Sequence, residues 1–140
     1  MINYIKHYEE GSLLFIDNYV QKARKSSLSI VKLLCEHALF SYDSRVNMTK
    51  KHFSLWAKVP IYIHDSLVLI PTKSPRNYDN QWINYCAVKR YEKSNDRTIV
   101  LLSNQIEISL EVSYQAFHKK MKLCQEIIDY LEDLEQHIYF

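Results

Sequence analysis

Two short apolar runs separated by three polar residues constrain the fold of this chain more than any other feature. Val59–Ile63 and Leu67–Ile70 flank His64, Asp65 and Ser66. Two strand-like runs on either side of a short polar turn predict a β-hairpin. Both faces of this hairpin are mostly apolar, so we expect it to be buried on both sides rather than to lie on the surface.

The register of the hairpin depends on its turn. If the turn has two residues, Ile61 faces Ile70 and Tyr62 faces Leu69. An Asp-Ser pair is a poor substitute for Asn-Gly in such a turn. A longer loop with a slipped pairing therefore stays open.

A polar, basic loop follows the hairpin. Residues 73–80 carry two cations and several turn-forming residues, and they lead straight into Trp82 and Ile83. Loops on rigid scaffolds are where function concentrates. Two interpretations of residues 73–80 follow, a functional loop and a solvated connector.

Strand patterns recur along most of the chain. Further strands are predicted over residues 11–16, 28–34, 81–91, 98–102 and 105–112. The second of these suits a helix as well, but Ile30 and Val31 are β-branched and favour a strand. Residues 17–25 are polar and compatible with a helix, residues 39–42 are expected to continue the sheet, and residues 43–54 suit a short helix or a loop.

From residue 114 onward the spacing of apolar residues changes from two to three and four. This spacing predicts an amphipathic helix of about six turns, with Ser113 as its N-cap. The apolar stripe comprises Tyr114, Phe117, Met121, Cys124, Ile128, Leu131, Leu134 and Ile138. It either packs on the sheet, which we favour, or forms a dimer seam. The predicted fold class is α+β, an antiparallel sheet made of a hairpin and a meander followed by a long C-terminal amphipathic helix.

Composition excludes several kinds of enzyme. The single glycine, Gly11, excludes a P-loop, a Rossmann fingerprint and a nucleophile elbow, because each needs glycines at fixed spacing. The three cysteines Cys35, Cys86 and Cys124 are far apart, which suits buried thiols rather than a disulfide framework or a zinc site. The six histidines are scattered without a recognised ligand spacing. We expect no catalytic activity, no metal site and no cofactor.

Charge is distributed unevenly along the chain. The net charge is +2 at pH 7, but the last fifteen residues hold five acids and no Lys or Arg. Residues 1–125 therefore carry 18 cations against 11 anions, a net charge of +7. A basic body of this kind can contact phosphates. The chain has no apolar run long enough to cross a bilayer and no signal-peptide pattern at its start, so we expect a cytoplasmic protein that binds no membrane.

Several short motifs follow one another in a fixed order. They are Tyr42-Asp43-Ser44-Arg45, Lys58-Val59-Pro60-Ile61, Ile70-Pro71-Thr72, Ser74-Pro75-Arg76, Trp82-Ile83, Leu102-Ser103-Asn104 and Ser113-Tyr114-Gln115-Ala116-Phe117. In order and spacing they resemble the ComK family, the competence transcription factors of Bacillus-type bacteria. The resemblance covers residues 42–121 well and the first forty residues weakly.

This resemblance implies a sequence-specific DNA-binding activator of the genes for DNA uptake. Members of the family bind paired A/T-rich tracts as multimers, largely from the minor groove, and bend the DNA. The expected partners are therefore A/T-rich double-stranded DNA and further copies of the same chain. Residues 1–140 are expected to form a single ComK-like DNA-binding domain.

Charge and loop placement select seven candidate DNA-binding residues. Narrow A-tract minor grooves concentrate negative potential and attract arginine or lysine, so we expect the two arginines of the set to enter the groove. The four lysines are expected to neutralise phosphates, and the asparagine to read the groove floor. The set is Arg45, Arg76, Lys50, Lys51, Lys58, Lys73 and Asn77. We expect its cations to share one side of the molecule, on turns of a rigid sheet, without a helix-turn-helix unit.

The chain departs from the family pattern near its end. Typical members continue into an extension with a Phe-x-Leu-x-Pro-like segment that a proteolytic adaptor recognises. An acidic helix ends this chain instead, so we do not expect regulation by that adaptor. Two rival functions stay open, a protein-interaction module that modulates a full-length regulator and an enzyme with a dispersed site.

Overall fold

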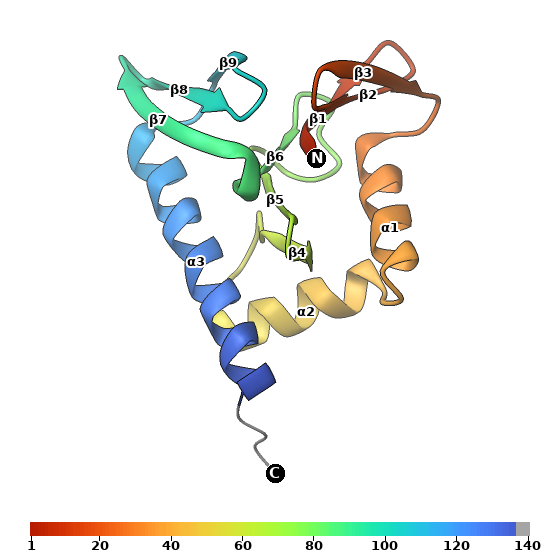
Figure 1. Cartoon of the computed structure of the whole chain (residues 1–140), viewed down its shortest axis with the longest axis vertical. Helices are drawn as coiled ribbons and strands as arrows, with labels where there is room; N and C mark the ends of the chain where they lie inside the picture. The colour runs from red at the N-terminus through yellow and green to blue at the C-terminus, as the bar shows by residue number, and fades with distance from the viewer. Residues whose placement is uncertain (137–140) are drawn as a thin grey trace.

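The computed structural model describes residues 1–136, apart from the side chain of Glu135, and contains two β-sheets and three α-helices (Figure 1). In chain order the elements are β1 (Ile2–Tyr8), β2 (Gly11–Ile16), β3 (Tyr19–Ala23), α1 (Ser27–His37), α2 (Tyr42–Phe53), β4 (Ile61–His64), β5 (Leu67–Pro71), β6 (Gln81–Asn84), a 3₁₀ helix η1 (Tyr85–Ala87), β7 (Val88–Ser94), β8 (Arg97–Leu102), β9 (Glu107–Leu110) and α3 (Tyr114–Gln136).

Both sheets are antiparallel. The larger sheet has the strand order β3-β2-β1-β6-β5-β4, and the smaller sheet has the order β7-β8-β9. Each pairing between neighbouring strands is antiparallel. Since the long helix α3 follows the sheets, the predicted α+β fold class is confirmed.

The hairpin of β4 and β5 has the predicted two-residue turn but not the predicted pairs. His64 pairs with Leu67 across the turn, and an irregularity in β4 then shifts the register by one residue. As a result Ile61 pairs with Leu69 instead of Ile70. Bulges of this kind place an extra residue in one strand, which a sequence pattern does not reveal.

The hairpin is buried on both sides because β5 separates two cores. Leu67 and Leu69 pack with residues of α1, whereas Val68 and Ile70 pack against Cys124 of α3. Successive side chains of a strand point to opposite faces, so one strand supplies both cores. Figure 1 shows α1 and α3 on opposite sides of β5. The prediction of two-sided burial is confirmed, since every residue of β5 is buried.

The strand predicted over residues 28–34 is wrong, because this segment forms α1. The Ser26 hydroxyl caps the helix by accepting a hydrogen bond from the Ser29 amide at 3.2 Å. Val31 and Cys35, one helical turn apart, are fully buried in the core. A capped helix with its apolar side on the sheet outweighs the β-propensity of Ile30 and Val31.

Three neighbouring predictions are also corrected or decided. Residues 17–25 contain the edge strand β3 rather than a helix, and β1 precedes the strand that was expected to be the first. Residues 39–42 do not continue the sheet, because residues 39–41 turn between α1 and α2, with Leu39 at a positive φ, and Tyr42 begins α2. Residues 43–54, for which a helix and a loop were both open, form most of α2.

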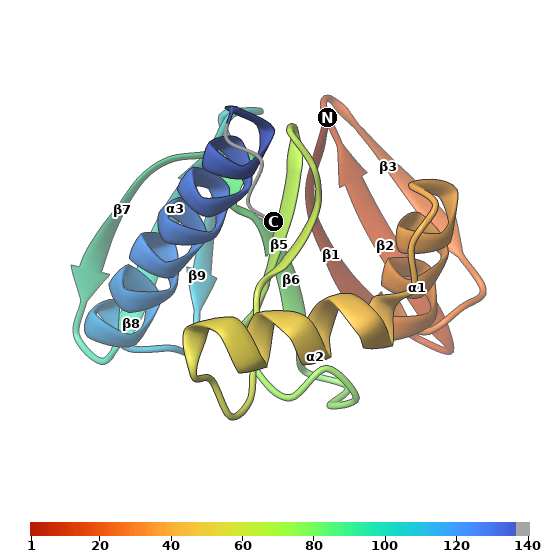
Figure 2. The same cartoon turned by 90° about the horizontal axis from the view of Figure 1, so that it is seen from below.

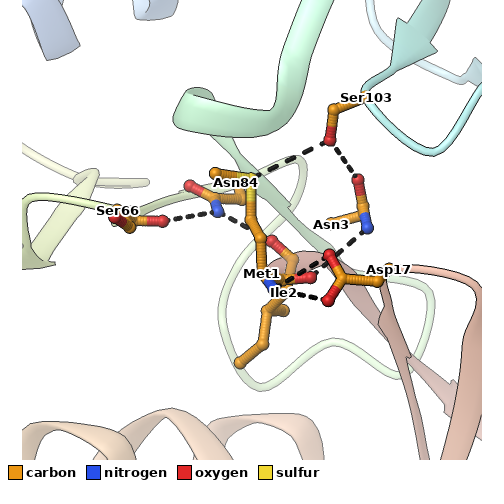
Figure 3. Close-up of polar contacts among 7 residues, drawn as sticks. All are labelled: Met1, Ile2, Asn3, Asp17, Ser66, Asn84 and Ser103. Atoms are coloured by element: carbon orange, nitrogen blue, oxygen red, sulfur yellow. Dashed lines mark hydrogen bonds and ion pairs between the residues drawn. The ribbon is translucent and has the colours of Figure 1, made fainter.

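The long strand predicted over residues 81–91 is divided between the two sheets at Asn84. The side-chain nitrogen of Asn84 donates to the backbone carbonyls of Ile2 and Ser66 at 2.7 and 2.9 Å (Figure 3). The side-chain oxygen of Asn84 accepts from the backbone amides of Val68 and Cys86, each at 3.1 Å. The side chain is fully buried and uses its hydrogen-bonding capacity on four segments. It therefore fixes the point at which the chain leaves the larger sheet.

The remaining predictions agree more closely with the structure. The strand over residues 98–102 is confirmed as β8, whereas the strand over residues 105–112 is shorter and forms β9. A hydrogen bond of 2.9 Å from the Ser103 hydroxyl to Asn3 Oδ1 joins the turn between these strands to β1 (Figure 3).

Helix α3 is confirmed, and its N-cap is Ser113, whose hydroxyl accepts from the Ala116 amide at 3.1 Å. Phe117 and Cys124 are buried in the cores formed with the sheets, and Met121 and Ile128 pack beside them, so packing on the sheet is confirmed for this part of the stripe. Ile138, the last predicted residue of the stripe, lies outside the described residues. Within residues 1–136, no helix is both long and apolar enough to cross a membrane.

Candidate nucleic-acid interface

Three of the seven predicted residues line one groove of about 370 Å³. Lys50 comes from α2, Lys58 from the segment between α2 and β4, and Arg76 from the loop between β5 and β6. A fourth cation, Lys32 of α1, lines the same groove. We call this site the cationic groove and define it by Lys32, Lys50, Lys58 and Arg76. Figure 2 shows the two loops that carry Lys58 and Arg76 on the same side of α2.

Helix α2 supplies one wall of the cationic groove. Tyr42, Val46 and Lys50 recur every four residues, which places them on one face of the helix. Asp43, in the first turn, also lines the groove and is the one carboxylate among its lining residues. Four cations thus share the groove with a single acid.

The segment that carries Lys58 is fixed at both ends. Ser54 ends α2 in the left-handed conformation, and the Leu55 amide donates to the Lys50 carbonyl at 2.9 Å. Val59, which follows Lys58, is buried. Lys58 itself has a φ of 53°. A non-glycine residue in this region costs about 1 kcal/mol or more, so the surrounding structure must hold it there.

The loop that carries Arg76 is built from two successive turns. The Asn77 amide donates to the Ser74 carbonyl at 2.9 Å, and the Asn80 amide donates to the Asn77 carbonyl at 3.0 Å. The buried side chain of Asn80 accepts from the Lys73 amide at 2.9 Å. Arg76 is therefore exposed on a loop whose shape is set by its own hydrogen bonds.

Tyr78 attaches this loop to the turn between β1 and β2. Its hydroxyl donates to the Glu9 carbonyl at 3.0 Å, and its ring stacks on His7 at a centroid distance of 4.9 Å. Asn77, predicted to read the groove floor, uses its side-chain oxygen to accept from the Asp79 amide at 2.8 Å. The observed role of that oxygen is to shape the turn.

Tyr42 contributes no charge to the groove near neutral pH. Burial, with smaller contributions from Cys35 and Asp43, raises the pKa of its hydroxyl to about 12, and the charge of Arg76 opposes this rise. The Lys32 ammonium lies 5.8 Å from the centroid of the Tyr42 ring, a cation–π distance.

The positive charge continues from the groove towards α3. Lys58 and Lys120 line a small neighbouring cavity of about 80 Å³. Burial lowers the pKa of Lys120, and the charges of Lys58 and Lys119 lower it further, while Cys124 opposes them. Lys120 therefore lies close enough to Lys58 for their charges to interact.

Arg45 lies outside the cationic groove. Its guanidinium carbon is 4.4 Å from the centroid of the Phe40 ring and 5.8 Å from that of Tyr62. It lines a different cavity, between α2 and α3, together with His52 and Tyr130. Arg45 and Arg76 therefore border different cavities, and the structure does not bring Arg45 into the groove that Arg76 lines.

Lys73 also lies outside the cationic groove. Its charge is paired with a carboxylate of the protein. Its ammonium is 3.2 Å from Glu111 Oε2, and Arg97 lies 3.5 Å from Glu111 Oε1. The hydrogen bond from Lys73, its charge and the neighbouring Arg97 lower the pKa of Glu111. Lys51 is exposed in the last turn of α2 without lining the groove. Of the six predicted cations, three thus line the cationic groove and three do not.

Comparison with models of protein families gives one match, to the ComK protein family, over residues 6–135. The chain belongs to the ComK family. This is a family of competence transcription factors. Comparisons with curated proteins and with solved structures gave no match.

Three of the seven motifs that resemble ComK proteins contribute residues to the groove. Lys58-Val59-Pro60-Ile61 leads into β4, and Ser74-Pro75-Arg76 opens the loop after β5. Tyr42-Asp43-Ser44-Arg45 forms the first turn of α2. The ComK-like Trp82-Ile83 pair is fully buried in β6, where it supports the sheet.

Two features of this ComK-family site were missed in the sequence. Lys32 lies in the segment expected to be a strand, and the serines before it were the signal for a capped helix. In addition, residues 38–41 join α1 and α2 as a short connection between two helices that cross steeply in Figure 1. The sequence had suggested no such helix pair.

Cysteines and metal-ligating side chains were also considered as candidate sites among the described residues. Cys35 and Cys124 are buried free thiols and Cys86 is a half-buried one. Among residues 1–136, no group of three or more His, Cys, Asp or Glu side chains could hold a metal ion.

Proposed function

We propose that this ComK-family protein regulates competence genes by binding A/T-rich double-stranded DNA through the cationic groove. The observation that supports this most directly is the convergence of Lys32, Lys50, Lys58 and Arg76 from four segments, with Asp43 as the one nearby acid. Like charges repel when they are brought together, and an anionic ligand relieves the repulsion. The phosphates of a DNA duplex form a continuous ligand of this kind.

We assign the groove residues different roles on the duplex. Arg76 is exposed on a hydrogen-bonded loop, so it is the residue we expect to enter the minor groove of an A/T tract. Lys50, Lys58 and the previously unassigned Lys32 are expected to contact phosphates. Lys51 is exposed near the end of α2 and can extend these contacts.

Arg45, Lys73 and Asn77 receive no DNA contact in this proposal. Arg45 packs on aromatic rings and Lys73 pairs with Glu111, so each has a partner within the protein. A contact with DNA would break these interactions before forming new ones.

Entry of α2 into the major groove is the alternative binding mode. The second helix of a helix-turn-helix unit contacts base edges through its N-terminal residues. Here that end of α2 carries Asp43, whose carboxylate repels the phosphates that border the groove. We therefore favour the minor groove and the loop that carries Arg76.

Binding assays on short duplexes test this proposal. We expect fluorescence anisotropy to show tighter binding to an A/T-tract duplex than to a G/C-rich one, and netropsin, which occupies A/T minor grooves, to displace the protein. Binding that netropsin leaves unchanged would favour the major groove. An absence of binding to any duplex, with capture of a regulator protein instead, would favour an interaction module.

The arginine on the loop provides a sharper test. Arg76→Ala should weaken binding to the A/T tract more than binding to a random duplex. Arg90→Ala, on exposed β7, is the matched control and should affect both duplexes little. Equal losses of affinity for both duplexes in Arg76→Ala would indicate that Arg76 contacts phosphates and does not enter the minor groove.

We also propose that the protein binds as a homo-oligomer and that the outer edge of β3 pairs two copies. β3 is the last strand of the larger sheet and exposes Tyr19 and Val20. A free strand edge is a template for pairing with another chain. Val20→Pro should reduce the mass measured by sedimentation; an unchanged mass would place the interface elsewhere.

A further inference from the structure

The two tryptophans of the chain lie in opposite environments. Trp82 is fully buried in β6, whereas Trp56, between α2 and β4, is 94% exposed. Tryptophan carries a large apolar surface that is normally covered at least in part. An almost completely exposed tryptophan is therefore a candidate for contact with a partner.

The exposure of Trp56 does not come from a loose segment. Ser54 and Lys58, two residues before and after it, both have left-handed backbone conformations. The Leu55 amide is bonded to the Lys50 carbonyl at 2.9 Å. The segment thus presents the indole from a short turn that is held at both ends.

The neighbours of Trp56 indicate what kind of partner it meets. Ala57 and Lys58, which follow it directly, line the cationic groove, so Trp56 stands at the edge of that groove. An apolar protein surface placed over this edge would remove Lys58 from water without a compensating charge. A DNA duplex offers phosphates to the cation and stacked bases to the indole.

We propose that Trp56 inserts between base pairs from the minor groove and kinks the duplex, while the cationic groove holds the adjacent phosphates. This inference rests on the proposed DNA-binding function. Proteins that bind the minor groove use apolar wedges in this way, and the energy of unstacking is offset by contacts that the bend permits. A flat aromatic ring can also stack on any base, so the wedge itself requires no particular sequence.

Tryptophan fluorescence provides the first test. We expect an A/T-tract duplex to quench the emission of Trp56 and to protect it from acrylamide. In Trp56→Phe the remaining emission comes from buried Trp82 and should not change when the duplex binds. Wild-type emission that stays unquenched when anisotropy shows full binding would overturn the wedge.

Affinity and bending provide the second test. Trp56→Ala should weaken binding to the A/T tract by about tenfold, the range for loss of one base stack, and should abolish the change in end-to-end energy transfer of a doubly labelled duplex. Met48→Ala, an exposed apolar residue that lines the cavity between α2 and α3, is the matched control and should bind and bend like wild type. Because Trp56 is exposed, Trp56→Ala should fold like the wild-type protein. The near-ultraviolet circular dichroism of Trp82 verifies this.

The outcomes separate the two proposals. If Trp56→Ala binds and bends DNA as wild type does, the wedge is overturned and the DNA-binding function remains. If the wild-type protein binds no duplex, both proposals are overturned.

Discussion

Lys58 combines an unfavourable backbone conformation with a place in the cationic groove. Its φ of 53° lies in the left-handed region, which glycine occupies at no steric cost. A lysine at this position costs folding stability, which is consistent with a role of its charge in binding the ligand. Stability and binding should therefore respond in opposite directions when the residue is changed.

Lys58→Gly should raise the free energy of unfolding by up to about 1 kcal/mol, because the left-handed strain is removed. The same change should weaken binding to an A/T-tract duplex by about fivefold, because one phosphate contact is lost. Urea unfolding and anisotropy measure the two effects. Lys58→Ala is the control, since it loses the charge and keeps the strain; unchanged binding in both variants would remove Lys58 from the interface.

Asn84 is the residue on which the connection between the two sheets depends most. Asn84→Ala leaves the amides of Val68 and Cys86 and the carbonyls of Ile2 and Ser66 without their partner. We expect a loss of about 2–4 kcal/mol in the free energy of unfolding, measured with urea.

An asparagine without these contacts provides the control for Asn84. Asn18→Ala, at an exposed turn, should change the free energy of unfolding by less than about 0.5 kcal/mol. Equal small losses in the two variants would contradict the role given to Asn84.

Single residues also explain why several turns could not be predicted. Seven non-glycine residues in the described part of the chain have positive φ: Glu9, Asp17, Leu39, Ser54, Lys58, Asn95 and Gln105. Asn95 is a common residue at such positions, and it lies between the strands predicted over residues 81–91 and 98–102. Leu39 and Lys58 are not, so the end of α1 and the turn before β4 carried no recognisable signal.

At the scale of elements, the helices of the groove depend on serine caps more than on intrinsic propensity. The hydroxyl of Ser41 accepts from the Ser44 amide at 3.2 Å at the start of α2, as Ser26 does for α1. Such a cap satisfies one of the free amides at the helix start. The helix that carries Lys50 should therefore respond to its cap.

Ser41→Ala should lower the free energy of unfolding by about 1 kcal/mol, because the cap is lost. Ser44→Ala, three residues later on the exposed side of the helix, should be neutral or slightly stabilising, since alanine favours the helix interior. Thermal or urea unfolding compares the two. Equal effects of both substitutions would contradict the capping role of Ser41.

The accuracy of the predictions differs between elements for a physical reason. α3 and the hairpin of β4 and β5 were predicted because each has a long or sharply bounded apolar pattern. α1 was not, since its short apolar run fits both periods and only tertiary packing decides between them. The same rule holds for the candidate site: the loop that carries Arg76 was predicted from its turn-forming residues, while the internal partners of Arg45 and Lys73 depend on contacts that spacing does not reveal.

At the scale of the whole molecule, the larger sheet separates two cores and the groove opens beside one of them. Cys35, in the core formed with α1, is fully buried, and Tyr42 borders both this core and the groove. Burial raises the pKa of the Cys35 thiol to about 11 and that of the Tyr42 hydroxyl to about 12. Both groups hold their protons more tightly in the folded state than in the unfolded state.

Stability should therefore fall at alkaline pH. In the unfolded chain these groups ionise near their ordinary pKa values of 9 and 10, below the folded values. The contribution of these two groups to the free energy of unfolding should decline as the pH rises from about 9 to about 12. Urea unfolding at pH 7.5 and 10.5 measures this decline. Tyr42→Phe should reduce the decline in the free energy of unfolding above pH 10. A free energy of unfolding of the wild-type protein that does not change up to pH 11 would contradict the burial of both groups.

The cationic groove and strand β7 provide a matched comparison of charge. A set of two lysines and one arginine can be replaced in each place, Lys50, Lys58 and Arg76 from the groove and Lys89, Arg90 and Lys93 from β7. β7 is an edge strand of the smaller sheet, where charged side chains discourage pairing with other chains. Figure 1 shows β7 in the upper part of the molecule and α2 across the lower part.

The salt dependence of binding to an A/T-tract duplex, compared between these two triple alanine variants, tests the central claim most directly. Each phosphate contact contributes about 0.9 to the slope of log affinity against log salt. We predict that the groove variant loses about 2 to 3 from this slope and most of its affinity, whereas the β7 variant keeps both. Equal losses in the two variants, or a loss confined to β7, would contradict a DNA interface at the cationic groove.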